Sequence, residues 1–252
     1  MTHAAAATGF ARNADAYERG RPGFPADAIA HLARVLRLGP DSRVLELGAG
    51  TGKATRQLVG TGATLTAIEP VAQMREQLTA RVPGVVAIDG TAECIPRPDC
   101  AADAVVAAQA FHWFDGPRAL REIARVLVPG GRLGLIWNAR EGGEPWIARL
   151  DAVFDRYRGD VPRYAAGEWR AAFAATSQFT PLHECAFAHV HMVDRAGVLD
   201  RVDSVSFIAA LADAERRDVL AEVGRIVDEG PGGSGEPIAM RYRTDVHWCQ
   251  RL

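Results

Sequence analysis

The sequence predicts an α/β protein whose doubly wound, mostly parallel sheet has seven strands and carries a helical cap insertion. Short, β-branched apolar runs alternate with longer stretches in which apolar residues recur every three or four positions, as in strands wound with helices. A glycine-rich turn follows the first strand, where open α/β sheets bind nucleotides. The last two strand-like runs flank a long helical stretch, which predicts an antiparallel edge to the sheet.

The first part of the chain predicts the parallel strands and the helices that connect them. Each predicted helix is amphipathic and ends near glycine or proline. The strands are expected at residues 44–47, 65–70, 85–88, 104–110 and 132–138, and the helices at residues 53–59, 71–82 and 117–131.

The pattern changes after residue 138. Residues 141–174 contain two helical stretches interrupted by glycine and proline, are rich in tryptophan and tyrosine, and are too long for an ordinary connection. We expect a cap over the substrate side within residues 139–200, in a single domain of residues 1–252. The remaining elements are expected at residues 181–193 (strand), 213–230 (helix) and 238–248 (strand).

Charge and composition exclude several classes of protein. The 29 lysines and arginines nearly balance 31 acidic residues, so no net field holds nucleic acid. The four cysteines form no Cys-x-x-Cys pair, which suits a reducing cytoplasm. We expect no signal peptide and no membrane span, because no apolar run approaches the required length of about 18 residues. These observations predict a cytoplasmic protein that binds neither nucleic acid nor a membrane, and they leave its oligomeric state open.

The strongest functional motif is the glycine turn at residues 46–52, Glu-Leu-Gly-Ala-Gly-Thr-Gly. A phosphate-binding P-loop is excluded, because the glycine spacing is one residue short and Lys53 is followed by Ala54. The dinucleotide fingerprint of dehydrogenases needs a small third residue, which Gly48-x-Gly50-x-x-Lys53 lacks. A nicotinamide-dependent dehydrogenase therefore stays as a less favoured alternative.

The strand that ends in Glu46-x-Gly48-x-Gly50-x-Gly resembles the first motif of the class I S-adenosylmethionine-dependent methyltransferases. Three later segments are similar to further motifs of this family. They are the Gly-x-Ala-Glu-x-x-Pro of residues 90–96, the Asp-x-Val of residues 103–105 and the Leu-x-Pro-Gly-Gly-x-Leu of residues 127–133. The resemblance implies a Rossmann-like methyltransferase fold and S-adenosyl-L-methionine as cofactor.

Two more segments narrow the resemblance to a subgroup. Residues 17–22, Tyr-Glu-Arg-Gly-Arg-Pro, and 109–115, Gln-Ala-Phe-His-Trp-Phe-Asp, look like those of small-molecule methyltransferases that include the trans-aconitate methyltransferase-like proteins. The resemblance is strong over about residues 10–138 and suggestive downstream. It implies methylation of a carboxylate or hydroxyl oxygen on a small molecule. N- or C-methylation and a non-catalytic cofactor-binding protein are the alternatives.

Ten residues are predicted to bind the cofactor. Glu69 closes the second predicted strand, where parallel pairing brings it beside the glycine turn, and its carboxylate can accept hydrogen bonds from both ribose hydroxyls. Tyr17 and Arg21 lie on one face if their segment is helical, and either hold the cofactor's carboxylate or pack as a surface arm. By the resemblance, residues 91–93 frame the adenine. The full set is Tyr17, Arg21, Glu46, Gly48, Gly50, Glu69, Thr91, Ala92, Glu93 and Gln109.

His112 is the candidate catalytic residue. It follows the fourth strand, beside the expected methyl donor, and an imidazole near neutrality can take a proton from the acceptor. The alternative is that it lines the pocket. His189 and His191 share one face of a predicted strand, but no third ligand lies at an obvious spacing, so no metal site is predicted.

Aromatic and basic residues of the cap region are candidates for contacts with the acceptor. The aromatic group suits an apolar or planar acceptor, or forms the core of the cap itself. The basic group binds an acid, or is simply solvated. The aromatic residues are Trp137, Trp146, Tyr157, Tyr164 and Trp169, and the basic ones are Arg140, Arg149 and Arg163.

Overall fold

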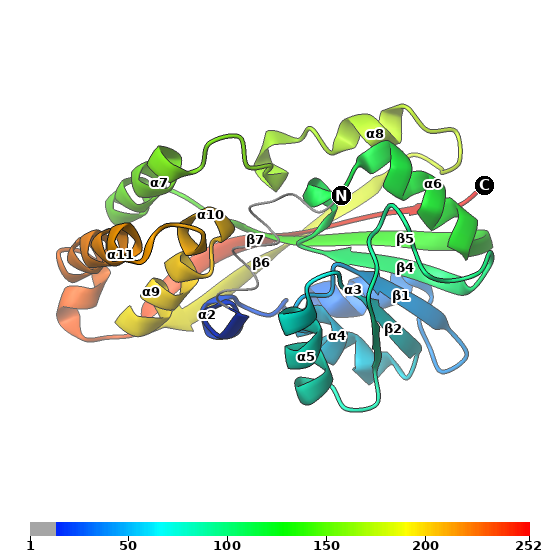
Figure 1. The fold of residues 1–252 in the computed structure, drawn as a ribbon, viewed down its shortest axis with the longest axis horizontal. Coiled ribbons are helices and arrows are strands. Elements are labelled where there is room, and N and C mark those ends of the chain that lie inside the picture. The colour runs from blue at the N-terminus through cyan, green and yellow to red at the C-terminus, as the bar shows by residue number, and fades with distance from the viewer. Residues whose placement is uncertain (1–13) are drawn as a thin grey trace.

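The computed structural model describes residues 14–252, which form one twisted sheet with helices on both faces (Figure 1). The sheet has the order β3-β2-β1-β4-β5-β7-β6, in which β1 to β5 are parallel and β7 is antiparallel to β5 and β6. The seven-stranded, mostly parallel sheet is thereby confirmed. The strands are β1 (Arg43–Leu47), β2 (Thr64–Ile68), β3 (Val86–Ile88), β4 (Ala102–Ala108), β5 (Leu127–Arg140), β6 (His183–Val193) and β7 (Ile238–Gln250).

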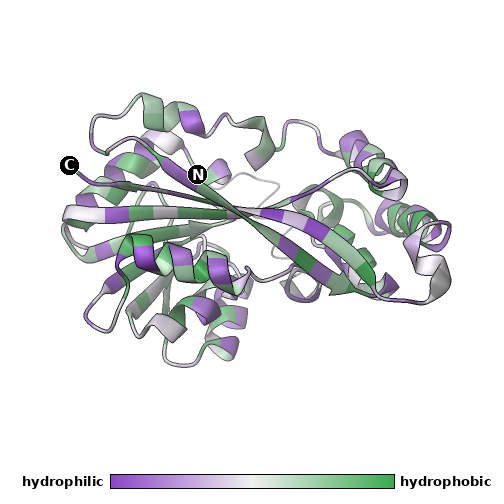
Figure 2. Cartoon of the chain, turned by 180° about the vertical axis from the view of Figure 1, so that it is seen from behind, coloured by the Kyte–Doolittle hydropathy of each residue, from purple (hydrophilic) through white to green (hydrophobic). Residues whose placement is uncertain are grey.

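Helices α3, α4 and α5 cover one face of the sheet, and α6 and α8 cover the other (Figure 1). Successive strand residues point to opposite faces, so Val44 clusters with Leu32 of α3, whereas Leu45 clusters with Leu120 of α6. Figure 2 shows hydrophobic residues along the central strands and many hydrophilic residues on the helices. These helices are α3 (Ala26–Leu36), α4 (Lys53–Leu58), α5 (Ala72–Arg81), α6 (Gly116–Val126) and α8 (Arg170–Ala174).

Two strands end two residues earlier than the sequence predicts, and both ends shape the edge of the sheet. β2 ends at Ile68, so Glu69 lies just beyond the strand, before Pro70, which has no N–H for a strand ladder. β4 ends at Ala108 because Gln109 has a φ of 56°, a left-handed conformation that interrupts a strand.

A second hydrophobic cluster lies at the far ends of β6 and β7 (Figure 1). It joins α7, α9, α10 and α11, which we call the cap, to Met240 and Tyr242 of β7. The cap therefore continues past residue 200, whereas α8 packs on the sheet beside α6; both findings differ from the predicted cap at residues 139–200. The cap helices are α7 (Pro145–Tyr157), α9 (Arg195–Asp203), α10 (Ser206–Ala209) and α11 (Asp213–Asp228).

The sequence analysis did not predict α3, α9 or α10. For α9 one local signal exists, because the Asp194 side chain accepts a hydrogen bond from Gly197 N at 2.7 Å, as N-cap residues do. No helix in the described part of the chain is long and apolar enough to cross a membrane. The remaining short elements are α2 (Ala14–Gly20) and the 3₁₀ turns η1 (Val59–Thr61), η2 (Phe111–Trp113), η3 (Tyr164–Ala166) and η4 (Pro231–Ser234).

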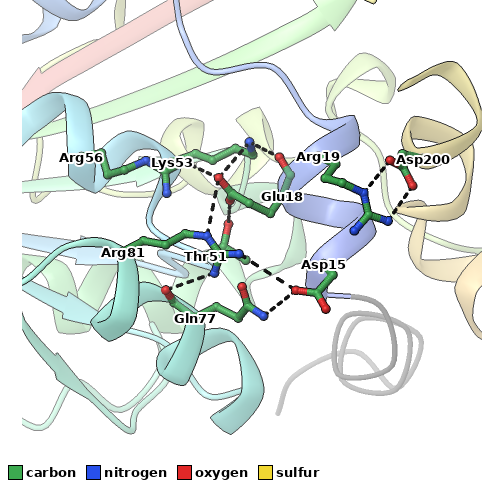
Figure 3. A network of polar contacts seen from close by, with 9 residues as sticks. All are labelled: Asp15, Glu18, Arg19, Thr51, Lys53, Arg56, Gln77, Arg81 and Asp200. Atoms are coloured by element: carbon green, nitrogen blue, oxygen red, sulfur yellow. Dashed lines mark hydrogen bonds and ion pairs between the residues drawn. The ribbon is translucent and has the colours of Figure 1, made fainter. Parts of the chain in front are cut away.

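Helix α2 links the start of α4 to the cap (Figure 3). On one side the Glu18 carboxylate accepts hydrogen bonds from Thr51 Oγ1 and Arg56 Nη2, both at 2.6 Å. Burial alone would raise the pKa of Glu18, but this hydrogen bond from Thr51 and the nearby positive charges lower it. On the other side Arg19 donates two hydrogen bonds to Asp200 of α9, at 2.7 and 2.8 Å. Polar contacts thus hold α2 both to the start of α4, beside the sheet, and to α9 of the cap.

Candidate functional site

A cavity of about 400 Å³ lies at the carboxyl ends of the parallel strands, with residues of the sheet edge, α2 and the cap in its wall. Glu46 does not line it and instead lines an adjoining cavity of about 30 Å³. The other residues predicted from the sequence meet in the wall of the larger cavity. They are Tyr17, Arg21, Gly48, Gly50, Glu69, Thr91, Ala92, Glu93, Gln109 and His112.

The glycine turn brings the main chain directly against this cavity. Gly48 and Gly50 have φ angles of 65° and 58°, which glycine adopts readily and other residues rarely do. Gly48 N donates to Ile68 O at 2.8 Å, which joins the turn to β2. A Cβ at Gly48 would lie 2.9 Å from the Cβ of Ala110, closer than side chains pack. A bare main chain is therefore required at this part of the wall.

The Glu69 carboxylate is fixed by two main-chain donors. Its Oε2 accepts from Gly50 N and its Oε1 from Val71 N, both at 2.9 Å. Burial raises the pKa of Glu69, although these two hydrogen bonds oppose the increase. Each oxygen of a carboxylate accepts a further hydrogen bond, so Glu69 can also bind a pair of hydroxyl groups in the cavity.

Glu46 is buried on the α4 side of β1, with 1% of its surface exposed. Its Oε2 accepts from Thr55 Oγ1 at 2.6 Å, whereas Oε1 is buried without a partner among the described residues. Burial, with the nearby charge of Glu69, raises the pKa of Glu46 to about 7. An unpaired carboxylate oxygen beside the smaller cavity is suited to a cationic group.

Replacing Glu46 with glutamine is expected to make stability less dependent on pH. The pKa of this carboxyl rises from 4.5 to about 7 on folding, so the wild type loses stability as pH rises through that window and the buried group ionises. The variant's free energy of unfolding should match the wild type near pH 4 and exceed it by up to about 3 kcal/mol at pH 8. Urea unfolding measures both values. The exposed Glu76→Gln is the control, and an equal difference at both pH values would refute the expectation.

Tyr17 and Arg21 approach the same part of the cavity, next to the glycine turn. The Arg21 guanidinium lies 4.9 Å from the centre of the Tyr17 ring. Arg21 Nε donates to Ser204 Oγ at 3.1 Å and Nη2 to the Ser204 carbonyl at 3.3 Å, so the residue also contacts the end of α9. Burial, with repulsion from Arg201, lowers the pKa of Arg21 to about 10. The group is still a cation at neutral pH.

The loops after β3 and β4 complete the sheet side of the cavity. Ala92 is buried, and Glu93 Oε1 accepts from Asp115 N at 2.9 Å, which ties the loop after β3 to the start of α6. Gln109 Nε2 donates to the Asn138 carbonyl at 3.1 Å. The loops are thus anchored to each other and to β5.

The surroundings of His112 favour the alternative that this residue lines the pocket. The Trp137 indole N–H donates to His112 Nδ1 at 3.1 Å. An indole N–H can only donate, so Nδ1 carries a lone pair and the neutral imidazole has its proton on Nε2. Burial, with repulsion from Arg21, lowers the pKa of His112 to about 3. A ring with its lone pair engaged and its pKa this low does not suit a general base; His112 lines the cavity with a donor N–H.

Most of the aromatic residues suggested for acceptor contacts are packing residues. Tyr164 stacks on both Trp137 and Trp169, with 4.5 Å between the ring centres of Trp137 and Tyr164, and the two indoles pack at a tilt. Of the five, Tyr164 alone lines the cavity, and its hydroxyl donates to Asp245 at 2.7 Å. The other two, Trp146 and Tyr157, pack in the cap cluster. The aromatic residues that line the cavity are Tyr17, Trp113, Phe114, Phe154, Tyr164 and Phe207.

The three arginines suggested for acid binding separate in the structure. Arg140 and Arg163 line the cavity, whereas Arg149 pairs with Glu229 away from it. Arg201 also lines the cavity, and the sequence analysis missed it because it lies on α9, a helix that the analysis did not predict. Its position depends on how the cap packs, and no local sequence signal shows it.

Comparisons with known proteins agree with this arrangement. The family profile described as a methyltransferase domain matches residues 45–135. The uncharacterized methyltransferase Rv3342 of Mycobacterium tuberculosis is 48% identical over 230 residues, 91% of this chain and 90% of the relative. The uncharacterized methyltransferase-like C25B8.10 of Schizosaccharomyces pombe is 34% identical over 230 residues, 90% of each chain.

A solved structure shares the fold. It is that of a putative type II methyltransferase from Anaeromyxobacter dehalogenans, with a TM-score of 0.66 and 22% identity over 92% of this chain and 97% of that one. Identity of nearly one half over nine-tenths of both chains, together with this sheet order, shows that the protein belongs to the class I S-adenosylmethionine-dependent methyltransferases.

Proposed function

We propose that this methyltransferase acts on a small molecule and methylates a carboxylate or hydroxyl oxygen inside the cavity. The observation that carries the proposal is a shared wall: sheet-edge residues suited to the cofactor and cap residues suited to an acceptor line one cavity of about 400 Å³. That volume lies within the range of small-molecule sites, roughly 300–1,000 Å³. The formal net charge of −2 gives no overall positive field that would hold a nucleic acid.

The residues around the glycine turn fit S-adenosyl-L-methionine. When bound, this cofactor supplies an electrophilic methyl group on a sulfonium. Glu69 would accept the ribose hydroxyls, and the loop at residues 91–93 would lie along the adenine. Arg21 beside Tyr17 would hold the methionine carboxylate, and the unpaired Oε1 of Glu46 suits the ammonium group.

The chain's own contribution to the reaction is alignment of the acceptor and exclusion of water. Proximity and orientation can lower a barrier by several kcal/mol, roughly 7–11 in well-oriented cases, without a covalent intermediate. A carboxylate acceptor is already ionised at neutral pH, so it needs no general base. This agrees with the hydrogen bonding of His112, whose Nε2–H can orient an acceptor oxygen.

Substitution of His112 should separate hydrogen-bond donation from base catalysis. We expect His112→Gln, which keeps a donor near Nε2, to retain most of the activity, and His112→Phe to lose about tenfold, the value of one good hydrogen bond. The pH profile of the wild-type kcat should show no inflection between pH 5 and 8 that arises from ionisation of His112. If the wild-type kcat falls as pH decreases through this range, and this fall is absent in His112→Gln, His112 acts as a general base.

Binding and transfer measurements test the proposed function. Calorimetry should show binding of S-adenosylhomocysteine and none of NAD, and mass spectrometry should detect transfer of a labelled methyl group to small carboxylic acids or phenols. Binding of NAD alone would refute the proposal and support a dehydrogenase. Cofactor binding without transfer to acids, phenols or amines would support a non-catalytic protein, and products methylated at nitrogen or carbon would refute O-methylation.

A further inference from the structure

Arginine side chains gather where the cap meets the cavity. Arg21 follows α2, Arg140 ends β5, and Arg201 lies on α9; all three line the cavity. Burial lowers the pKa of Arg21 to about 10 and also lowers the pKa of Arg140, and the charge of Arg201 contributes to both decreases. Arg201 therefore lies close enough to repel both Arg21 and Arg140.

The hydrogen-bonding groups of two of these arginines are incompletely used. Arg140 donates from Nη2 to Asp151, and its guanidinium lies 5.4 Å from the centre of the Phe154 ring. Within residues 14–252, Nη1 of Arg140 and both Nε and Nη1 of Arg201 are buried without a hydrogen-bond partner. Arg21 differs, because it donates to Ser204 from two of its nitrogens.

The charges that line the cavity are out of balance. Among residues 14–252, five arginines line it against three carboxylates, and two of those carboxylates, Glu69 and Glu93, follow strands of the sheet edge. Asp151 is the carboxylate from the cap, and it pairs with Arg140 while remaining half exposed, at 47%. The cap end of the cavity therefore carries an excess of positive charge.

Buried cationic donors without partners are costly, because each loses the hydrogen bonds that water would supply. Native proteins retain few such groups, and those retained call for a ligand or another specific explanation. Two guanidinium groups with free N–H donors match the oxygens of a carboxylate, which binds arginine through paired, charge-assisted hydrogen bonds.

We propose that Arg140 and Arg201 form an anion subsite that binds a carboxylate of the methyl acceptor. This inference rests on the proposed function and names the acceptor class: a small organic acid. Arg140 is the more specific marker of the acceptor side, because it packs on α7 of the cap and does not line the small cavity beside Glu46. Arg201 lines both cavities, so the cofactor's own carboxylate is the competing source of the anion.

Binding of a matched pair of probes to the enzyme loaded with S-adenosylhomocysteine tests the subsite. We expect calorimetry to show glutarate binding at least about tenfold more tightly than the neutral glutaramide, as one charge-assisted hydrogen bond would give. Arg140→Met and Arg201→Met should each weaken glutarate binding by about tenfold or more and leave S-adenosylhomocysteine binding within about threefold. Arg140→Lys keeps the positive charge, so its affinity for glutarate should lie between those of the wild type and Arg140→Met.

Arg149→Met is the matched control, because Arg149 lies on α7 like Asp151 and Phe154 but pairs with Glu229 outside the cavity. It should leave glutarate binding unchanged. Thermal melting checks that each variant folds, and Arg201→Lys replaces Arg201→Met if the latter does not.

Three results would overturn the subsite. Glutarate binding no better than glutaramide would show that no anion is preferred. Unchanged glutarate binding in both methionine variants would show that other residues hold it. If both variants weaken S-adenosylhomocysteine as much as glutarate, while 5′-methylthioadenosine, which lacks the amino acid, still binds normally, the arginines serve the cofactor. Failure of the wild type to bind S-adenosylhomocysteine would instead refute the proposed function itself.

Discussion

Replacing Glu69 with alanine is expected to weaken binding of S-adenosylhomocysteine by about a hundredfold or more. Two hydrogen bonds from ribose hydroxyls to this carboxylate would be lost, each worth about 1.5–3 kcal/mol when the acceptor is charged. The change also leaves Gly50 N and Val71 N without their acceptor, which loosens the glycine turn. Isothermal titration calorimetry measures the loss.

Two further variants make the result specific to Glu69. Glu69→Gln keeps one acceptor oxygen and should lose about tenfold in affinity. Glu76→Gln removes an exposed charge from α5 and should bind as the wild type does. If Glu69→Ala folds normally and binds the ligand with less than a threefold loss, Glu69 does not hold the ribose.

Replacing Gly48 with alanine is expected to weaken cofactor binding strongly. The new Cβ would lie 2.9 Å from the Cβ of Ala110 and would occupy the wall where the main chain meets the cavity. A positive φ adds strain of about 1–3 kcal/mol for a residue other than glycine. We therefore expect an affinity loss of about a hundredfold or more, from strain together with lost contacts, measured by the same calorimetry.

Gly84→Ala is the matched control for backbone strain. Gly84 also has a positive φ, of 89°, but a Cβ there meets no atom within 4 Å, and it does not line the cavity. Both variants should lower the free energy of unfolding by about 1–3 kcal/mol, and only Gly48→Ala should lose binding. Equal binding by the two variants would mean that close approach at Gly48 is unimportant.

Much of the sheet side of the site could be predicted from local sequence. Glu69 and the glycine turn follow neighbouring strands, and parallel strands place their carboxyl ends at one edge. Glu46 is the last but one residue of β1, close to the same edge of the sheet, but it lines the smaller cavity. Strand side chains alternate between faces, so Glu46 points toward Thr55 of α4 rather than into the larger space.

The cap was harder to predict because its helices, which are far apart in the sequence, pack against one another in a single hydrophobic cluster. Its cluster joins helices before and after β6 to the start of β7, so no single segment carries the pattern of the whole. Residues 139–200 were therefore an incomplete boundary, and α10, only four residues long, has too few positions to show a period. Phe207 of this helix and Arg201 of α9 consequently escaped the sequence analysis.

The amino-acid sequence by itself determined the order of strand, glycine turn and carboxylate, because strand alternation and the conformational range of glycine are local properties. Only the tertiary structure brought Trp137 of β5 within hydrogen-bonding distance of His112, which lies 25 positions earlier in η2, and this contact favours one tautomer of the imidazole. It also placed Arg140 and Arg201 in the wall of one cavity with unpaired donors. Hydrogen bonds and charge repulsion between distant segments exist only once the cap packs on the sheet, so they depend on the fold and not on spacing along the chain.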